Sequence, residues 1–412
     1  MKRKYFLLGV IQIIIACCLF SNVFGQTNSA FIDTIGAKSS IDRAMYQQIR
    51  GGLSNSYIQF VKKETGRVVF LGGSITEMSG WREKVCAYLT TKFPETKFDF
   101  INAAIPSTGS TPAAFRLTTD VLAKGKIDLL FEEAAVNDGG QTQEEDIRGM
   151  EGIVRHALQV NPFMDIALMY FVDPGKITDY NNGKTPLVIE AHNKVAIHYN
   201  LPSLNLAKEV ADRINVKEFT WENDFKNLHP APFGQELYFQ SIRSWLENCW
   251  KQVDIQKGRR SHATAKQMNK SSYTKGAYAN IHKASVINGW TVDEKWRPTD
   301  GKSTRKGFVD VPMLISTTPG STFTFTFKGS AVGICLVAGP DAGIFEYSID
   351  GCDFHSNDQY TPWSKDLYLN VFAVLGDGLS PSKHNLKIRI SEKKNEKSLG
   401  NACRIVHFLV NE

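Results

Sequence analysis

The sequence predicts two folded parts, an α/β domain followed by an all-β sandwich. Between residues 68 and about 250, continuous apolar runs alternate with segments whose apolar residues recur at helical spacing. Repeated strand–helix units of this kind form a parallel sheet covered by helices on both faces. From 276 to 412, short runs of alternating character, such as STFTFTFK at 321–328, are separated by Gly, Pro, Asp and Ser, as in a β-sandwich. A chain of 412 residues is also longer than one hydrophobic core usually supports.

The elements of the α/β domain follow from the same patterns. Residues 68–71 are continuously apolar, as in a strand buried on both faces, and Trp81, Val85 and Leu89 then mark one face of a helix over 81–92. The remaining segments are predicted as strands at 98–101, 127–131, 166–172 and 204–206, and as helices near 112–124, 143–160, 186–198 and 238–246.

Composition places the domain boundaries. We expect a lead-in segment at 26–67, the α/β domain at 68–250 and the sandwich at 276–412. Between the two domains, residues 251–275 hold seven Lys or Arg against a single Asp. This segment is predicted to be a solvated basic linker, with a patch for an anionic polymer as the alternative.

The first 25 residues have the pattern of a secretory signal peptide. Lys2, Arg3 and Lys4 precede an apolar stretch that ends near Phe20, followed by small residues at a cleavage position. We therefore expect a secreted or periplasmic protein. The alternative is a lipoprotein anchored through Cys17 to an outer membrane or cell surface. No other segment approaches the 18 apolar residues of a membrane span.

Charge and cysteine content exclude several classes of protein. Removing residues 1–25, which hold three basic and no acidic residues, lowers the net charge from +6 to +3, so nothing favours a nucleic-acid partner. Five of the seven cysteines remain, without CxxC spacing. This is poor evidence for a zinc site or a disulfide framework.

Ser74 follows two glycines at the carboxyl end of the first predicted strand, the edge where ligands bind in open α/β sheets. A serine nucleophile needs a base, commonly His, and donors for the oxyanion. Three later segments supply such groups, each after its predicted strand or before the last helix: the small-residue loop NAAIPSTGS at 102–110, the AAVND run containing Asn137, and NLHP containing His229.

The order of GGSITE at 72–77, the small-residue loop, AVND and HP resembles the SGNH, or GDSL-type, hydrolase family over residues 68–250. The resemblance implies a flavodoxin-like three-layer α/β/α fold and ester hydrolysis through an acyl-enzyme, with no metal and no cofactor. It makes Ser74 the nucleophile and His229 the general base. The oxyanion donors would be the backbone N–H of Ser74, the backbone N–H of Ser107 and the side-chain amide of Asn137. Ser107 occupies the place of the family's second-block Gly, and Gly109 could hold that role after a small shift.

The third triad residue is out of register. Family members carry an acid three residues before the His, where this chain has Lys226. Asp224 is the candidate acid. The alternatives are orientation of His229 by Asn227 or by a backbone carbonyl, and a Ser–His dyad.

The sandwich suggests the substrate. It resembles the jelly-roll modules beside bacterial carbohydrate esterases, and Tyr360, Trp363 and Tyr368 are either sugar-stacking platforms or core residues. The expected function is a secreted serine esterase that removes O-acyl groups, most simply O-acetyl, from a polysaccharide or oligosaccharide. The alternatives are a lipase- or thioesterase-like hydrolase of the same family and a catalytically inactive glycan-binding protein.

Overall fold

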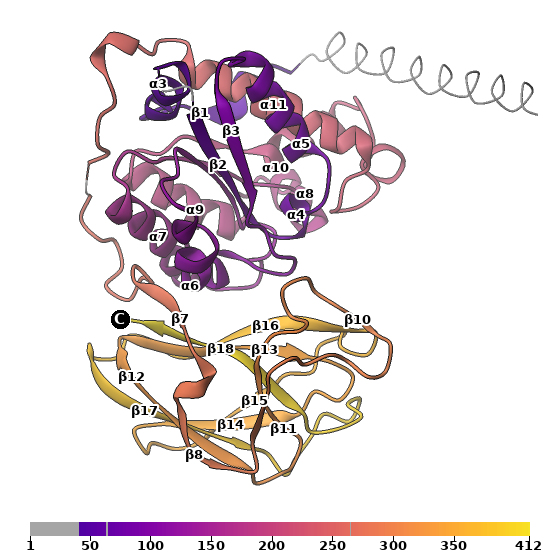
Figure 1. Ribbon diagram of the computed structural model, residues 1–412. Coiled ribbons are helices and arrows are strands. Elements are labelled where there is room, and N and C mark those ends of the chain that lie inside the picture. Colours follow the sequence, from indigo (N-terminus) through magenta and orange to yellow (C-terminus); the bar gives the residue numbers. More distant parts are fainter. Residues whose placement is uncertain (1–40, 63–64, 264) are drawn as a thin grey trace, which may run out of the picture.

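The computed structural model describes residues 41–62, 65–263 and 265–412. The α/β domain and the sandwich lie one above the other in Figure 1, joined by a single connecting segment. The predicted signal peptide and Cys17 fall outside the described residues. Within the described ranges, no helix is long and apolar enough to cross a membrane.

The α/β domain contains one six-stranded sheet. Its strands are β1 (Gln47–Gln48), β2 (Thr65–Gly72), β3 (Lys97–Asn102), β4 (Leu129–Glu133), β5 (Asp165–Met169) and β6 (Ser203–Leu204). The order is β1-β6-β5-β4-β2-β3, with β1 antiparallel to β6 and every other pair parallel. The strand that opens the parallel series, β2, lies between β3 and β4, which is the flavodoxin-like order. The predicted fold class is confirmed.

Helices cover both faces of this sheet. They are α3 (Ser54–Lys62), α4 (Ser74–Glu77), α5 (Trp81–Lys92), α6 (Ser110–Asp120), α7 (Gln143–Val160), α8 (Pro174–Asn181), α9 (Leu187–His198), α10 (Leu206–Asn215) and α11 (Pro232–Trp250). Helices α6, α7 and α9 pack against one another on one face, and α5 and α11 pack together on the other. The core between them is aromatic: the rings of Phe70 and Phe131 stack, with centroids 5.2 Å apart, and Trp81 packs edge-on against both.

Besides the short helix α4, four elements of the α/β domain were absent from the sequence prediction. The strand β1 and the helix α3 lie in the segment predicted only as a lead-in, and α8 and α10 follow the last two parallel strands. The strand β1 is only two residues long and forms by pairing with β6, so it has no local pattern of its own. The strand predicted at 166–172 ends at Met169, and the strand predicted at 204–206 ends at Leu204 because α10 begins at Leu206.

The second domain is a β-sandwich, as predicted. One sheet has the order β10-β16-β13-β18-β11-β9, with β7 paired to β18, and the other has the order β15-β14-β17-β12-β8. The strands are β7 (Gly276–Ala279), β8 (Ala284–Asn288), β9 (Thr291–Asp293), β10 (Ser303–Thr304), β11 (Met313–Ser316), β12 (Thr322–Gly329), β13 (Ala331–Ala338), β14 (Ile344–Ile349), β15 (His355–Asp358), β16 (Leu367–Gly376), β17 (Ser382–Ile390) and β18 (Cys403–Asn411). Alternate residues of β12, including Phe323 and Phe325, face the core between the sheets. The five cysteines of the described residues are free.

The segment predicted as a solvated linker is held against the α/β domain instead. Arg259 donates to Gln59, and His262 lies 3.0 Å from the buried carboxylate of Asp165. Further along, the fully buried carboxylate of Glu151 accepts hydrogen bonds from the backbone N–H groups of Met268 and Asn269 and from the hydroxyl of Ser272. Arg259 and the neighbouring His262 thus hold this segment against the α/β domain, whereas the other six basic residues of 251–275 are exposed.

The two domains meet through α6 and the connecting strand β7, which pack against each other. The ring of Tyr273 lies 4.8 Å from the ring of Phe115 on α6, and Arg148 on α7 forms an ion pair with Asp377 just beyond β16. This docking brings β16 of the sandwich opposite the loops at the carboxyl edge of the parallel sheet.

The role of Glu151 can be tested by proteolysis. Glu151→Gln weakens several buried hydrogen bonds to a charged acceptor, each contributing about 1.5–3 kcal/mol. We therefore expect trypsin to cleave at Lys266 or Lys270 at least about tenfold faster than in the wild type, because cleavage tracks the population of the opened segment. The matched control is Glu144→Gln, since Glu144 is an exposed carboxylate on the same helix that also contacts Asn269. Equal cleavage rates in the two variants would contradict this role.

Candidate active site

Ser74 and His229 lie 155 residues apart in the sequence of the α/β domain, and the fold brings their side chains together. Ser74 is the first residue of α4, directly after β2, and its backbone N–H is one of the initial helical donors that have no partner within the helix. His229 lies in the loop before α11, where Pro232 occupies the first helical position. The Nε2 atom of His229 is 2.7 Å from the Oγ atom of Ser74. This is the hydrogen-bond distance that a serine nucleophile and its base require.

Asn137 packs directly against the residue before the serine. It lies in a turn after β4, in which its N–H donates to the carbonyl of Ala134. A Cβ atom placed on Gly73 would stand 2.0 Å from Oδ1 of Asn137, so a side chain at position 73 would displace the Asn137 amide. The loops after β2 and β4 are therefore in close contact, with the Asn137 side chain against Gly73. This contact places the Asn137 amide beside the Ser74 backbone.

The third predicted oxyanion donor, Ser107, lies in the loop after β3. Its backbone is left-handed, with a φ of 64°, a conformation that glycine adopts without strain and other residues rarely do. A glycine would therefore be unstrained at position 107. Gly109 has an ordinary negative φ. A Cβ there would lie 1.8 Å from Oδ1 of Asp138, so a side chain at position 109 would displace that carboxylate.

A buried cluster of polar side chains, centred on Asp138, holds the turn that carries Asn137. Asp138 accepts hydrogen bonds from the N–H of Ser110 and the amide of Gln141, and its second oxygen lies 3.0 Å from Nε2 of the fully buried His192. This arrangement ties the turn after β4 to the start of α6 and to α9. It was not expected from the sequence, since the partners are far apart along the chain.

Within the described ranges, Asp138, Asp146 and His192 are the group whose possible metal-ligand atoms lie within 4.8 Å of one another. Burial, reinforced by the negative charge of Asp138, raises the pKa of Asp146 to about 8. Asp146 is therefore mostly protonated at neutral pH, whereas a metal ligand must be deprotonated. Since Asp138 and His192 already bond to each other, we interpret the cluster as support for Asn137.

The structure does not bring Asp224 to His229. The segment Trp221–Phe225 forms a π-helical turn, and the carboxylate of Asp224 accepts hydrogen bonds from the N–H and hydroxyl of Thr220, at 2.8 and 3.2 Å. Lys226, at the position of the family's acid, ends that turn with a φ of 75°. No hydrogen bond to Nδ1 of His229 is formed by any described residue. The side chain of Asn227 instead accepts from the backbone N–H of His229, at 2.7 Å.

Two effects lower the pKa of His229 below its ordinary value. Partial burial contributes most, and the positive charge of Arg305 adds to it. Both disfavour the imidazolium, so His229 is neutral and able to accept a proton at neutral pH. Arg305 directly follows β10 of the sandwich, and no local sequence signal connects it with His229.

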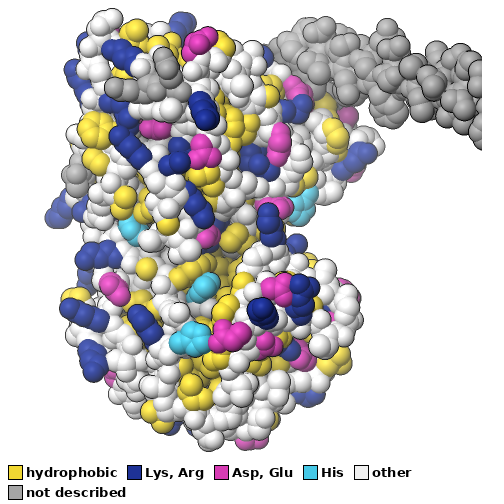
Figure 2. Space-filling model, viewed as in Figure 1, with side chains coloured by type: hydrophobic (Ala, Val, Ile, Leu, Met, Phe, Trp, Pro, Cys, Tyr) yellow, Lys and Arg dark blue, Asp and Glu magenta, His cyan; other side chains and the backbone are white. Residues whose placement is uncertain are grey.

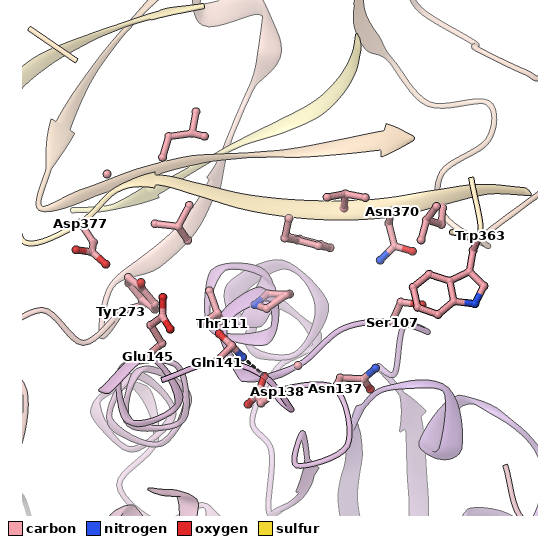
Figure 3. A pocket seen from close by; sticks show the side chains of 18 residues that line it. Ser107, Thr111, Asn137, Asp138, Gln141, Glu145, Tyr273, Trp363, Asn370 and Asp377 are labelled. Atoms are coloured by element: carbon pink, nitrogen blue, oxygen red, sulfur yellow. Dashed lines mark hydrogen bonds between the residues drawn. The ribbon is translucent and has the colours of Figure 1, made fainter. Parts of the chain in front are cut away.

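A pocket of about 680 Å³ opens between the domains. Ser74 and His229 are not part of its lining, but Asn137, which packs against Gly73, is. Ser107 and Asn137 line it on the α/β side, and Asn370 and Trp363 face them from the sandwich (Figure 3). The molecule is hollowed between the domains on the face shown in Figure 2, with hydrophobic side chains inside the hollow. Of the three aromatic residues singled out in the sequence, Trp363 is 64% exposed, whereas Tyr368 is buried against Trp296.

No family model and no curated protein matches the sequence. Among solved structures, the chain is similar to a two-domain esterase (CEX) active on acetylated mannans, crystallised with mannopentaose. The TM-score is 0.74 at 19% identity, covering 91% of this chain and 99% of that one. A second structure of a two-domain esterase (CEX) active on acetylated mannans matches with a TM-score of 0.73 at 20% identity, covering 88% and 97% of the two chains. The two-domain fold is therefore shared over nearly the whole length of both chains.

Asp224 provides a test of the triad. Because its carboxylate bonds to Thr220 and not to His229, we expect Asp224→Ala to keep kcat for p-nitrophenyl acetate within about tenfold of the wild type. Loss of a triad acid lowers kcat by about 10⁴, and a drop of that size would show that Asp224 reaches His229 during catalysis. Glu222→Ala, which removes an exposed acid of the same turn, is the control.

The charge of Arg305 should be visible in the pH profile. Since this cation lowers the pKa of His229, Arg305→Gln should raise that pKa and move the acidic limb of the kcat/KM profile to higher pH. The neighbouring exposed cation is removed in the control Lys306→Gln, which should shift the limb less. A profile unchanged by Arg305→Gln would show that its charge does not act on the base.

Proposed function

We propose that this chain is a secreted serine esterase that removes O-acetyl groups from a polysaccharide through an acyl-enzyme. The observation that carries this proposal is the 2.7 Å separation of Ser74 Oγ and His229 Nε2, at the carboxyl edge of a parallel sheet where the loops after three adjacent strands converge.

In the proposed mechanism His229 takes the proton of Ser74 as Oγ attacks the ester carbonyl. The oxyanion that forms would be stabilised by the backbone N–H groups of Ser74 and Ser107 and by the side chain of Asn137. His229 would then give its proton to the departing sugar hydroxyl, leaving an acetyl group on Ser74. A water molecule, deprotonated by the same imidazole, would release acetate. Each of these steps uses groups of the chain and water alone.

Two observations favour a glycan as the alcohol part of the ester. The pocket that Ser107 and Asn137 line is open and is lined by both domains, which suits a substrate longer than a simple ester. Trp363 also presents a mostly exposed ring at its border, and exposed aromatic faces are suited to stacking on sugars. The similar two-domain esterase acts on acetylated mannans, so we propose acetylated mannan as the first substrate to test.

The cellular location and the domain limits complete the proposal. We propose that residues 1–25 direct secretion or export to the periplasm, with anchoring through Cys17 as the alternative. We also propose that the second domain starts at residue 276, where β7 begins, and that it takes part in binding the glycan.

The function can be tested by acetate release from acetylated mannan, xylan and pectin. We expect Ser74→Ala to lower the rate at least about 10³-fold, whereas Ser79→Ala, an exposed serine of the same segment, should retain wild-type activity. Trp363→Ala should raise KM for the acetylated glycan and leave hydrolysis of p-nitrophenyl acetate unchanged. Wild-type protein that releases no acetate from any of the three would favour the inactive glycan-binding alternative. Faster hydrolysis of the octanoate than of the acetate ester would favour the lipase-like one.

A further inference from the structure

The loop that carries Ser107 is held firmly on the side that faces its own domain. The guanidinium of Arg116, which is fully buried, donates to the carbonyl of Ala103 and to the hydroxyl of Thr108. That hydroxyl also lies 2.7 Å from the carbonyl of Ile105. These contacts involve the residues on both sides of the Pro106–Ser107 peptide unit but not the unit itself.

The hydrogen bond to that peptide unit comes from the second domain. Asn370 lies on β16, is only 2% exposed, and its Nδ2 atom donates to the carbonyl oxygen of Pro106 at 3.3 Å. Figure 3 shows Asn370 on the sandwich side of the pocket, across from Ser107. The Oδ1 atom of Asn370 is buried and has no hydrogen-bond partner among the described residues. The side chain therefore has one recorded hydrogen bond, and that bond crosses the domain interface.

The carbonyl of Pro106 and the N–H of Ser107 belong to the same planar peptide unit. In a trans peptide these two groups point in opposite directions, so a donor that fixes the carbonyl also fixes the direction of the N–H. A hydrogen bond accepted by the carbonyl further polarises the unit and strengthens the N–H as a donor. An anchor matters here because Ser107 has a left-handed backbone with a φ of 64°, a conformation that is strained in a non-glycine residue.

We propose that Asn370 is a positioning residue for the esterase reaction: the second domain orients the Ser107 N–H toward the oxyanion through the carbonyl of Pro106. This inference rests on the proposed function. It assigns the sandwich a part in the chemical step in addition to any part in binding glycan. Because the oxyanion exists only after attack on the carbonyl, the contribution appears in kcat and leaves KM nearly unchanged.

The test uses the full chain and p-nitrophenyl acetate, which is too small to require the glycan pocket. Loss of an oxyanion donor lowers kcat about 10²–10³-fold, and a donor that is misdirected but present should cost less. We expect Asn370→Ala to lower kcat about 10- to 100-fold, with KM within about threefold of the wild type. The matched control is Asn411→Ala, which removes an equally buried asparagine of the same domain whose hydrogen bonds go to Ser272, Lys275 and Ser330.

A second variant covers the case in which Asn370→Ala fails to fold. Asn370→Asp keeps the shape of the side chain but faces the Pro106 carbonyl with a carboxylate, which donates a hydrogen bond only when protonated. Its kcat relative to wild type at each pH should therefore be low at pH 8 and rise toward pH 5.5. A purely structural role would not produce this recovery in a protein that is folded throughout the range.

The outcomes separate the inference from the function on which it rests. Wild-type kcat in both Asn370 variants, or a rise in KM alone, would overturn the inference while Ser74-dependent hydrolysis upholds the function. Wild-type protein without any Ser74-dependent hydrolysis would overturn both. A kcat loss in Asn411→Ala equal to that in Asn370→Ala would also refute the inference, because it would trace the effect to domain packing.

Discussion

The buried guanidinium of Arg116 is the interaction on which the candidate site depends. It reaches from α6 to the carbonyls of Gly72 and Ala103, the residues at the ends of β2 and β3, at 3.3 and 2.5 Å. The N–H of Ile105 donates to the same Gly72 carbonyl. Burial of a charged group is costly unless the group is paired and hydrogen-bonded, and Arg116 also forms an ion pair with Asp120 at 3.0 Å. This arginine and the two loops must therefore take up their positions together, which places the Ser107 loop beside Ser74 before any substrate arrives.

The site is completed by a domain that is distant along the chain. Asn370 bonds to the loop that carries Ser107, the charge of Arg305 acts on His229, and Trp363 borders the pocket. The docking of the sandwich is reinforced by the connecting segment, which Glu151 holds in place through hydrogen bonds to its backbone. Residues of the sandwich thus contribute directly to the candidate site, and the sandwich is docked against the α/β domain.

The orientation of His229 is achieved here without a carboxylate at Nδ1. The π-helical turn Trp221–Phe225 directs Asp224 back to Thr220, and Lys226 stands where the family carries its acid. Asn227 holds the backbone of His229, and the Oγ of Ser74 fixes the other ring nitrogen. A carboxylate partner would raise the pKa of the imidazole, whereas partial burial and Arg305 lower it. The arrangement therefore favours a neutral imidazole at His229.

The sequence by itself determined both folds and the four segments of the candidate site, because those features are local. Continuous apolar strands, helical stripes and period-two runs report burial within a few residues of chain, and Ser74, Ser107, Asn137 and His229 each follow or precede such an element. Only the tertiary structure decided which other side chains contact these four residues or act on them through their charge. The short strand β1 exists through its pairing with β6, and Asp224 turned toward Thr220 because a π-helical turn changed its register. Asn370, Arg305 and His192 reach their partners across 54 to 264 residues of sequence, or across the domain interface. Contacts over such separations leave no periodic pattern in the chain, so they follow from tertiary packing within the α/β domain or between the two domains.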